Sequence, residues 1–152
     1  MLKQMYPFYA AFTANVIAQV LKPLIYYAMN KTWKWHLLLD SGNLPSSHTA
    51  MVSALLLAVG IVENFSSTIF AVTLVFFLIV TYDATNVRFY AGRNIQITQQ
   101  LIRDFEALTQ KNLENPVYLL KVKEVLGHKW IEVITGMILG FSVSLIFYFF
   151  IK

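Results

Sequence analysis

The residues best suited to chemistry lie in one short polar stretch, Asn43-Leu44-Pro45-Ser46-Ser47-His48-Thr49-Ala50-Met51, which opens directly onto an apolar run. Pro45 predicts a helix start, with Ser46 or Ser47 as its N-cap. The first turn of that helix offers unpaired N–H groups and the positive end of the helix dipole, which together favour an anion such as phosphate. His48 in this turn can give or take a proton near neutral pH. A capped helix with an incidental histidine at a membrane interface explains these residues equally well.

The composition shows which class of protein must position this stretch. The 152 residues are 57% hydrophobic and only 13% charged, with a mean hydropathy of +0.58. The net charge of +4 is spread among apolar segments, so nothing indicates nucleic-acid binding. Without cysteine the chain has no disulfide framework, thiol nucleophile or thiolate metal site. We therefore expect one integral membrane domain over residues 1–152, in a bacterial plasma membrane.

Four apolar blocks are long enough to approach the roughly 20 residues that a bilayer crossing requires. They predict an all-α fold, an integral membrane four-helix bundle with an additional cytoplasmic or interfacial helical segment at about residues 89–130. Ser66 or Ser67 is expected to cap the third helix. Gly136 and Gly140 form a small-xxx-small face that serves either packing inside the bundle or a homodimer, and we lean towards a homodimer. The expected spans are about residues 7–29, 45–62, 68–88 and 131–151.

The connection between the third and fourth spans is expected to be helical. The third helix should continue past Asp83 out of the membrane, because polar residues recur there at helical spacing. Its apolar positions from Ile97 to Leu108 lie on one face, which rests on the membrane surface or packs against the rest of the cytoplasmic region. A short helix is predicted from Val117 to Leu126.

Basic residues concentrate in the first and third connections, so the positive-inside bias places both in the cytoplasm and both termini outside. Trp33, Trp35 and His36 are typical of an interfacial belt. On the first span, a polar stripe suggests that Lys22 faces the protein interior instead of extending its amine to the membrane surface. With this topology, polar residues of all four spans meet at one membrane face: Lys22, His48, Asp83, Arg88, His128 and Glu132.

Phosphoryl transfer from a lipid phosphate suits such a set of residues. Cations and a helix N-terminus would hold the phosphate oxygens, while one histidine attacks phosphorus and the other protonates the leaving alcohol. Glu132, one helical turn after His128, either fixes the imidazole tautomer or is an interfacial charge near Lys129. His48, His128, Asp83 and Glu132 include metal-binding types but lack a ligand spacing, and we expect neither a metal nor another cofactor.

At these residues the sequence resembles the divergent branch of the type 2 phosphatidic acid phosphatases, which are related to acid phosphatases and vanadium-dependent haloperoxidases. The matching blocks follow in family order along nearly the whole chain. They are Gln19-Val20-Leu21-Lys22, Asn43 to Ala50, Tyr82-Asp83-Ala84-Thr85-Asn86-Val87-Arg88 with Ala91-Gly92-Arg93, and Lys123-Glu124-Val125-Leu126-Gly127-His128 with Glu132-Val133 and Gly136.

The resemblance implies a hydrolase that works through a phosphohistidine. It makes His128 the nucleophile, His48 the general acid and Glu132 the orienting carboxylate, with Ser46, Ser47 and nearby amides binding phosphate. The sequence departs from the superfamily pattern at several positions. Asn15 and Val122 stand where cations are expected, Lys121 replaces a serine, Ser47 replaces a glycine, and glutamate at 132 replaces aspartate.

Because two motif cations are missing, other cations on the same face must replace them. Our hypothesis is that Lys22, Arg88 and Lys123 bind the phosphate, supported by Arg93, Asp83 and Gln19. Three functions stay open. The first is a metal-independent phosphatase acting on the phosphomonoester or diphosphate of a lipid or polyprenol. The second is a non-catalytic protein that binds or transports phospholipids or polyprenyl phosphates, and the third is a structural membrane subunit.

Overall fold

The computed structural model of the chain describes residues 2–40, 43–110, 113 and 130–151, and all regular structure in these residues is helical. The predicted all-α fold is therefore confirmed. The predicted helix from Val117 to Leu126 lies outside the described residues. The elements are α1 (Leu2–Asn30), the 3-10 helix η1 (Trp35–Leu38), α2 (Ser47–Glu63), α3 (Thr68–Tyr82), the π-helical turn η2 (Asp83–Val87), α4 (Arg88–Thr109) and α6 (Trp130–Ile151).

Three helical stretches are long and apolar enough to cross a membrane, namely Gln4–Asn30, Thr68–Thr109 and Trp130–Phe150. The outward faces of α3 and α6 expose large apolar side chains, as surfaces that meet lipid do. The fourth apolar helix, α2, has 17 residues. The protein is thus an integral membrane protein built from four apolar helices.

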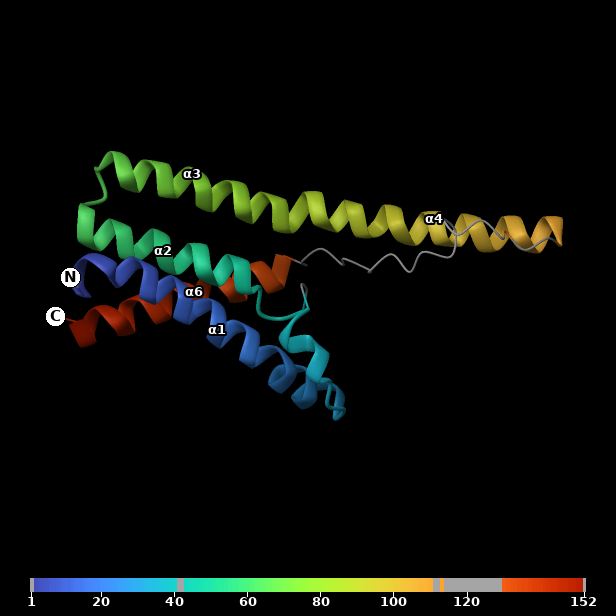
Figure 1. Cartoon of the computed structure of the whole chain (residues 1–152), viewed down its shortest axis with the longest axis horizontal. Coiled ribbons are helices and arrows are strands. Elements are labelled where there is room, and N and C mark those ends of the chain that lie inside the picture. Colours follow the sequence, from blue (N-terminus) through green and yellow to red (C-terminus); the bar gives the residue numbers. More distant parts are fainter. Residues whose placement is uncertain (1, 41–42, 111–112, 114–129, 152) are drawn as a thin grey trace.

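Helix α2 lies at the centre of the bundle, where it contacts α1, α3 and α6 (Figure 1). Its buried face is made mostly of small residues, and the core around it is built from alanines of two helices, Ala14 and Ala18 on α1 with Ala50 and Ala54 on α2. Small side chains let the helix backbones approach closely, which is how helices associate where water supplies no hydrophobic driving force.

The two glycines of α6 are where that helix packs on α2. A Cβ added at Gly136 would lie 2.6 Å from the Ser46 carbonyl oxygen, and one at Gly140 would overlap the carbonyl oxygen of Ala50. Neither position tolerates a side chain without displacing backbone. Of the two uses that the sequence left open, the structure shows packing inside the bundle.

The third span continues without a break into α4 through η2, as predicted, and α4 projects beyond the bundle (Figure 1). In the π-helical turn the Thr85 hydroxyl donates to the carbonyl oxygens of Thr81 at 3.0 Å and Tyr82 at 3.3 Å. These bonds support backbone oxygens where the hydrogen-bond register changes. On α4 the predicted apolar face is exposed, Leu108 to 85%.

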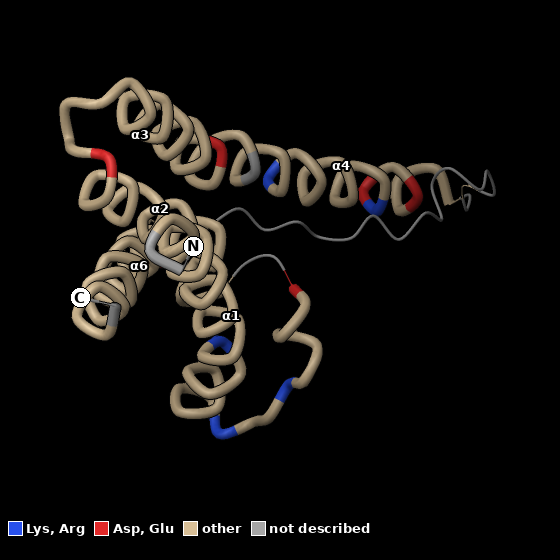
Figure 2. Tube along the Cα trace, turned by 60° about the vertical axis from the view of Figure 1, so that its left-hand side comes forward, with Lys and Arg blue, Asp and Glu red and all other residues tan. Residues whose placement is uncertain are grey.

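Charges of the described residues lie mostly at helix ends, in the α1–α2 connection and along α4, as Figure 2 shows. Both chain termini lie at one end of the bundle (Figure 1). At the opposite end, which we call the loop end, α1 finishes at Asn30, α2 begins at Ser47, α3 passes into η2 at Asp83 and α6 begins at Trp130. Antiparallel succession of the helices thus brings the polar residues of distant segments to the loop end.

Candidate functional site

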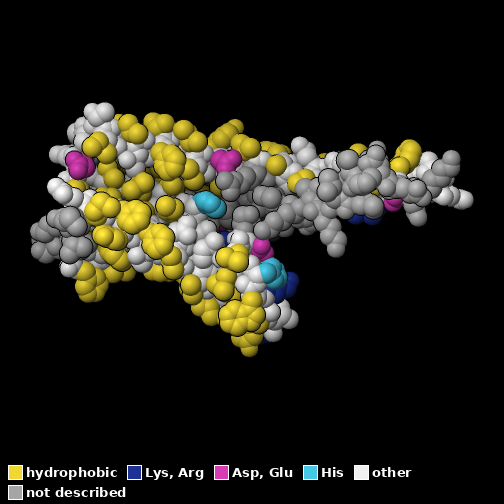
Figure 3. All heavy atoms as spheres, viewed as in Figure 1, with side chains coloured by type: hydrophobic (Ala, Val, Ile, Leu, Met, Phe, Trp, Pro, Cys, Tyr) yellow, Lys and Arg dark blue, Asp and Glu magenta, His cyan; other side chains and the backbone are white. Residues whose placement is uncertain are grey.

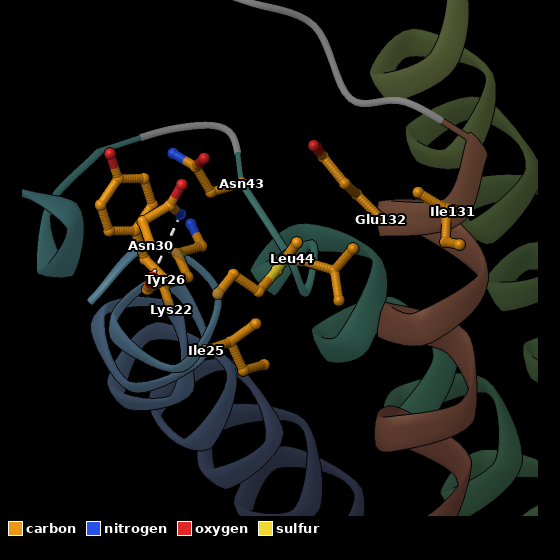
Figure 4. A pocket seen from close by; sticks show the side chains of 9 residues that line it. Lys22, Ile25, Tyr26, Asn30, Asn43, Leu44, Ile131 and Glu132 are labelled. Carbon is orange, nitrogen blue, oxygen red and sulfur yellow. Dashed lines mark hydrogen bonds between the residues drawn. The ribbon is translucent and has the colours of Figure 1, made fainter. Parts of the chain in front are cut away.

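A cavity of about 250 Å³ opens at the loop end between α1, the start of α2 and the start of α6. Helix α1 diverges from α2 and α6 towards its C-terminal end (Figure 1). Figure 4 shows the side chains that line the cavity. They come from α1 (Lys22, Ile25, Tyr26, Met29, Asn30), from the residues before α2 (Asn43, Leu44) and from α6 (Ile131, Glu132).

Lys22 is the central cation of this cavity. Only 1% of it is exposed, so it faces the protein interior as the polar stripe on α1 predicted. Its Nζ donates to the backbone carbonyl oxygen of Asp40 at 2.8 Å. A buried ammonium is costly unless it is hydrogen-bonded or paired. The carboxylates of Glu132 and Asp40 are the nearby negative charges that act on it.

Glu132 lines the opposite side of the cavity from Lys22, on the first turn of α6 (Figure 4). Its backbone is fixed by the start of α2, because the Ser46 N–H donates to the Glu132 carbonyl oxygen at 2.9 Å. The close approach at Gly136, one turn further on, holds the same two helices together. The structure therefore brings Lys22 and Glu132, which are 110 positions apart in the numbering, to one cavity.

The two serines of the polar stretch are buried at the start of α2. Ser46 is the N-cap of α2, since its Oγ accepts from the Thr49 N–H at 3.4 Å and from the Thr49 hydroxyl at 3.0 Å. Ser46 is fully buried and Ser47 is 1% exposed. Neither residue lines the cavity. The structure thus gives Ser46 a structural role, while its predicted role as a phosphate ligand stays a prediction.

His48 is exposed in the first turn of α2, at the loop end where the sequence predicted it. Its predicted partner His128 lies outside the described residues, as does Lys123. Of Arg88 the structure describes only the backbone, at the first position of α4. The pairing of the two histidines and the two cations expected beside Lys22 therefore stay predictions.

The three supporting residues lie in different places. Gln19 is one turn before Lys22 on α1, and its Oε1 is buried without a hydrogen-bond partner among the described residues. Asp83 lines a second cavity together with Trp130. Arg93 is exposed on α4, with its guanidinium 5.7 Å from the centre of the Phe89 ring. Within the described chain no three His, Asp or Glu side chains gather as metal ligands would.

Three contributors to the cavity were missed by the sequence reasoning. Asn43 was recognised as part of the polar stretch but received no role, and its side chain lines the cavity together with Lys22 and Glu132 (Figure 4). Asp40 acts through its backbone oxygen, which no side-chain pattern reveals. Tyr26 also lines the cavity, and its spacing of four residues from Lys22 is the signal that would have found it.

Comparison with known proteins places these features in a family. The sequence matches the divergent PAP2 family over residues 3–143, a range that includes every residue lining the cavity. It is 34% identical over 150 residues to the uncharacterized membrane protein YuiD of Bacillus subtilis (strain 168), and the match covers 95% of each chain. No solved structure matches the chain. With an all-helical membrane bundle and a match along nearly its whole length, the chain belongs to the divergent PAP2 family.

Proposed function

We propose that the protein is a membrane lipid-phosphate phosphatase that hydrolyses the phosphomonoester or diphosphate of a lipid or polyprenol at the cytoplasmic membrane face. The observation that carries this proposal is the buried ammonium of Lys22 in an open cavity at the loop end, in a chain of the divergent PAP2 family. A cation enclosed in this way suits a ligand that brings negative charge.

The geometry of Lys22 supports an anion in the cavity. A lysine ammonium has three N–H donors, and within the described part of the chain one of them is used, by the Asp40 carbonyl. An ammonium can also donate to phosphate oxygens, and the amide of Asn43, which lines the same cavity, is a further donor. The volume of about 250 Å³ is below the roughly 300–1,000 Å³ of sites that enclose a whole small molecule. It suits a head group whose hydrocarbon lies elsewhere.

In the proposed reaction the His128 imidazole attacks phosphorus, a P–N bond forms and the P–O bond to the lipid alcohol breaks. His48 gives its proton to the leaving alcohol oxygen. Water then attacks phosphorus, His48 accepts a proton from that water, and the P–N bond breaks to release phosphate. Glu132 orients the imidazole of His128 and stabilises its positive charge. These roles come from the family resemblance.

One observation favours a second candidate, a protein that binds or moves lipid phosphates without hydrolysing them. Asn15 stands where the superfamily motif has a cation, and its Nδ2 lies 3.7 Å from the Met51 sulfur on α2. Asn15 is thus engaged inside the bundle and does not line the cavity. A site with fewer cations can still retain an anion while stabilising the transferring phosphoryl group less well.

The deciding experiment measures phosphate release by the detergent-solubilised protein from a panel of lipid phosphates, with a chelator present. We expect turnover by the wild type, loss of turnover in His128→Ala and a strong reduction in His48→Ala. Equal release by the wild type and both variants would remove the enzymatic proposal. Saturable binding of a radiolabelled lipid phosphate without release by the wild type would favour the second candidate.

A further inference from the structure

A second cavity, of about 600 Å³, lies at the loop end between the last turn of α3, the π-helical turn η2 and the first residue of α6. We call it the α3–α6 groove. Its volume falls within the roughly 300–1,000 Å³ typical of sites for small organic ligands. Its wall includes Leu78, Ile79, Tyr82, Thr85, Val87 and Trp130.

The lining of the groove is mostly apolar, and its polar members are Thr81, Asp83, Thr85 and Asn86. The Thr85 hydroxyl donates to backbone carbonyl oxygens of the preceding turn, and the Asn86 amide donates to the Thr85 hydroxyl oxygen at 3.0 Å. These two side chains are therefore satisfied within the helix. The Thr81 hydroxyl is buried without a hydrogen-bond partner among the described residues, and Asp83 adds a carboxylate to the wall. The rest of the wall that an occupant meets is hydrocarbon and the side chains of Tyr82 and Trp130.

The groove opens on the side of the molecule that meets the bilayer. Its apolar wall residues are exposed, with Leu78 at 55%, Ile79 at 60% and Trp130 at 65%. They belong to two of the stretches that are long and apolar enough to cross the membrane. The medium around such a stretch is lipid, so the occupant that enters most readily is a lipid chain.

The π-helical turn also sets the position of this groove. A π-helical turn inserts an extra residue into the helix, and such turns are frequent at functional sites. Here η2 contacts α6 and so joins the long helix to the start of the last one. The groove lies beside this contact, with Trp130 on one side and the end of α3 on the other.

The groove is also next to the candidate phosphate site. Trp130 lines the groove, whereas Ile131 and Glu132, the following two residues of α6, line the cavity of Lys22. Successive side chains of an α-helix point about 100° apart, so the first turn of α6 separates a polar compartment from an apolar one. A molecule that fills both must carry an anionic group and a hydrocarbon chain.

We propose that the α3–α6 groove binds the hydrocarbon chain of the lipid phosphate whose head group lies against Lys22. This inference rests on the proposed function for the choice of head group, but it does not require turnover. Under this proposal α3, η2 and Trp130 select the substrate by its hydrocarbon chain. None of the candidate catalytic residues His48, His128 and Glu132 belongs to these elements. A chain in the groove also explains how a cavity of head-group size serves a lipid.

The test uses the full chain in detergent and phosphatidic acid that carries a photoreactive diazirine on one acyl chain. Peptide mass spectrometry then locates the crosslinks. We expect them on residues 78–87 and Trp130, and we expect excess unlabelled phosphatidic acid to reduce them several-fold. Crosslinks spread evenly over the exposed faces of α3 and α6, and unaffected by the competitor, would mean ordinary boundary lipid and would overturn the proposal.

A matched pair of variants provides the control. Leu78→Trp places a bulky ring in the groove, whereas Ile69→Trp adds the same ring near the other end of α3 at a position of equal exposure, 56% against 55%. We expect the competable crosslinks to fall several-fold in Leu78→Trp and to persist in Ile69→Trp. Equal crosslinking in both variants would contradict the proposal that the chain binds in the groove.

A neutral probe separates this inference from the proposed function. Diacylglycerol with the same photoreactive chain should label the groove more weakly than phosphatidic acid, and Lys22→Met should abolish the difference. If both probes label the groove equally in the wild type, the groove holds a chain but the phosphate site at Lys22 is wrong. If excess unlabelled lipid does not reduce the labelling by either probe, the groove does not bind a lipid chain, whatever the turnover assay shows.

Discussion

At the scale of single residues, the candidate site depends on how Lys22 is held. The side chain leaves α1 inside a membrane-spanning stretch, yet it is buried and donates to a backbone oxygen of the following connection. The neutral carbonyl of Asp40 accepts one hydrogen bond from the ammonium, and the carboxylates of Glu132 and Asp40 are the negative charges near it. An incoming phosphate supplies the opposite charge, which is the physical reason to expect binding here.

The substitution Lys22→Met tests this expectation, since it keeps an unbranched side chain of similar length and removes the charge. A hydrogen bond to a charged group contributes about 1.5–3 kcal/mol, which corresponds to roughly 10- to 100-fold in affinity. We expect binding of a lipid phosphate, measured with the radiolabelled lipid, to weaken by that factor. The unfolding temperature should stay within a few degrees. Unchanged affinity in a folded variant would place the anion elsewhere.

Glu132→Gln keeps the shape of the side chain and removes the negative charge that is proposed to stabilise the imidazolium of His128. We expect the turnover number to fall by roughly 100-fold, with a smaller change in the Michaelis constant, because the charge matters most in the transition state. Glu63→Gln is the matched control, a glutamate at the end of α2 away from the loop end. Comparable losses in both variants would argue against a specific role of Glu132.

The same residues show what could be read from the sequence. Lys22 and Glu132 were identified because a charge within an apolar span and a carboxylate at a span boundary are conspicuous. Residue type predicted an N-cap at Ser46 or Ser47, and the structure shows it at Ser46. The Asp40 carbonyl could not be foreseen, since every residue has one and only the folded path of the connection brings this one to Lys22. Nor could residue type alone show that the Ser46 hydroxyl would be buried as a helix cap.

At the scale of elements, the site depends on the contact between α2 and α6. The Ser46–Glu132 backbone bond and the close approach at Gly136 fix the start of α6 against the cap of α2. Helix positions were predictable to within a few residues because apolar blocks and serine caps mark them. The sequence could not predict which helices contact one another. Gly136 and Gly140 suit an internal face or a dimer equally well until the partner helix is known.

Gly140→Val is expected to separate the two helices, since a side chain there meets the Ala50 backbone. Overpacking of this kind costs about 1–3 kcal/mol, so the unfolding temperature in detergent should drop by several degrees. Ser142→Val, at an exposed position of the same helix, should leave it nearly unchanged. A lost dimer with undiminished stability in Gly140→Val would instead assign this face to an interface between copies.

At the scale of the whole molecule, four antiparallel helices carry both chain ends to one end of the bundle and both long connections to the other (Figure 1). Figure 3 shows the consequence on one face, where hydrophobic side chains cover the bundle and most charged ones gather towards the loop end. The predicted convergence of polar residues at one end of the bundle follows from the antiparallel order of the helices alone.

The positive-inside bias predicts that the loop end faces the cytoplasm, and the absence of cysteine makes this easy to measure. Single-cysteine variants Lys34→Cys and Glu63→Cys put a thiol in the α1–α2 connection and in the α2–α3 turn, at opposite ends of the bundle. In intact cells a membrane-impermeant maleimide should label Glu63→Cys at once and Lys34→Cys only after permeabilisation. The reversed pattern would place the cavity of Lys22 at the outer face, so that its lipid phosphate would have to come from the outer leaflet. Labelling of both thiols after permeabilisation would confirm that the reagent can reach each of them. A difference between the two variants in intact cells would then come from the orientation of the bundle.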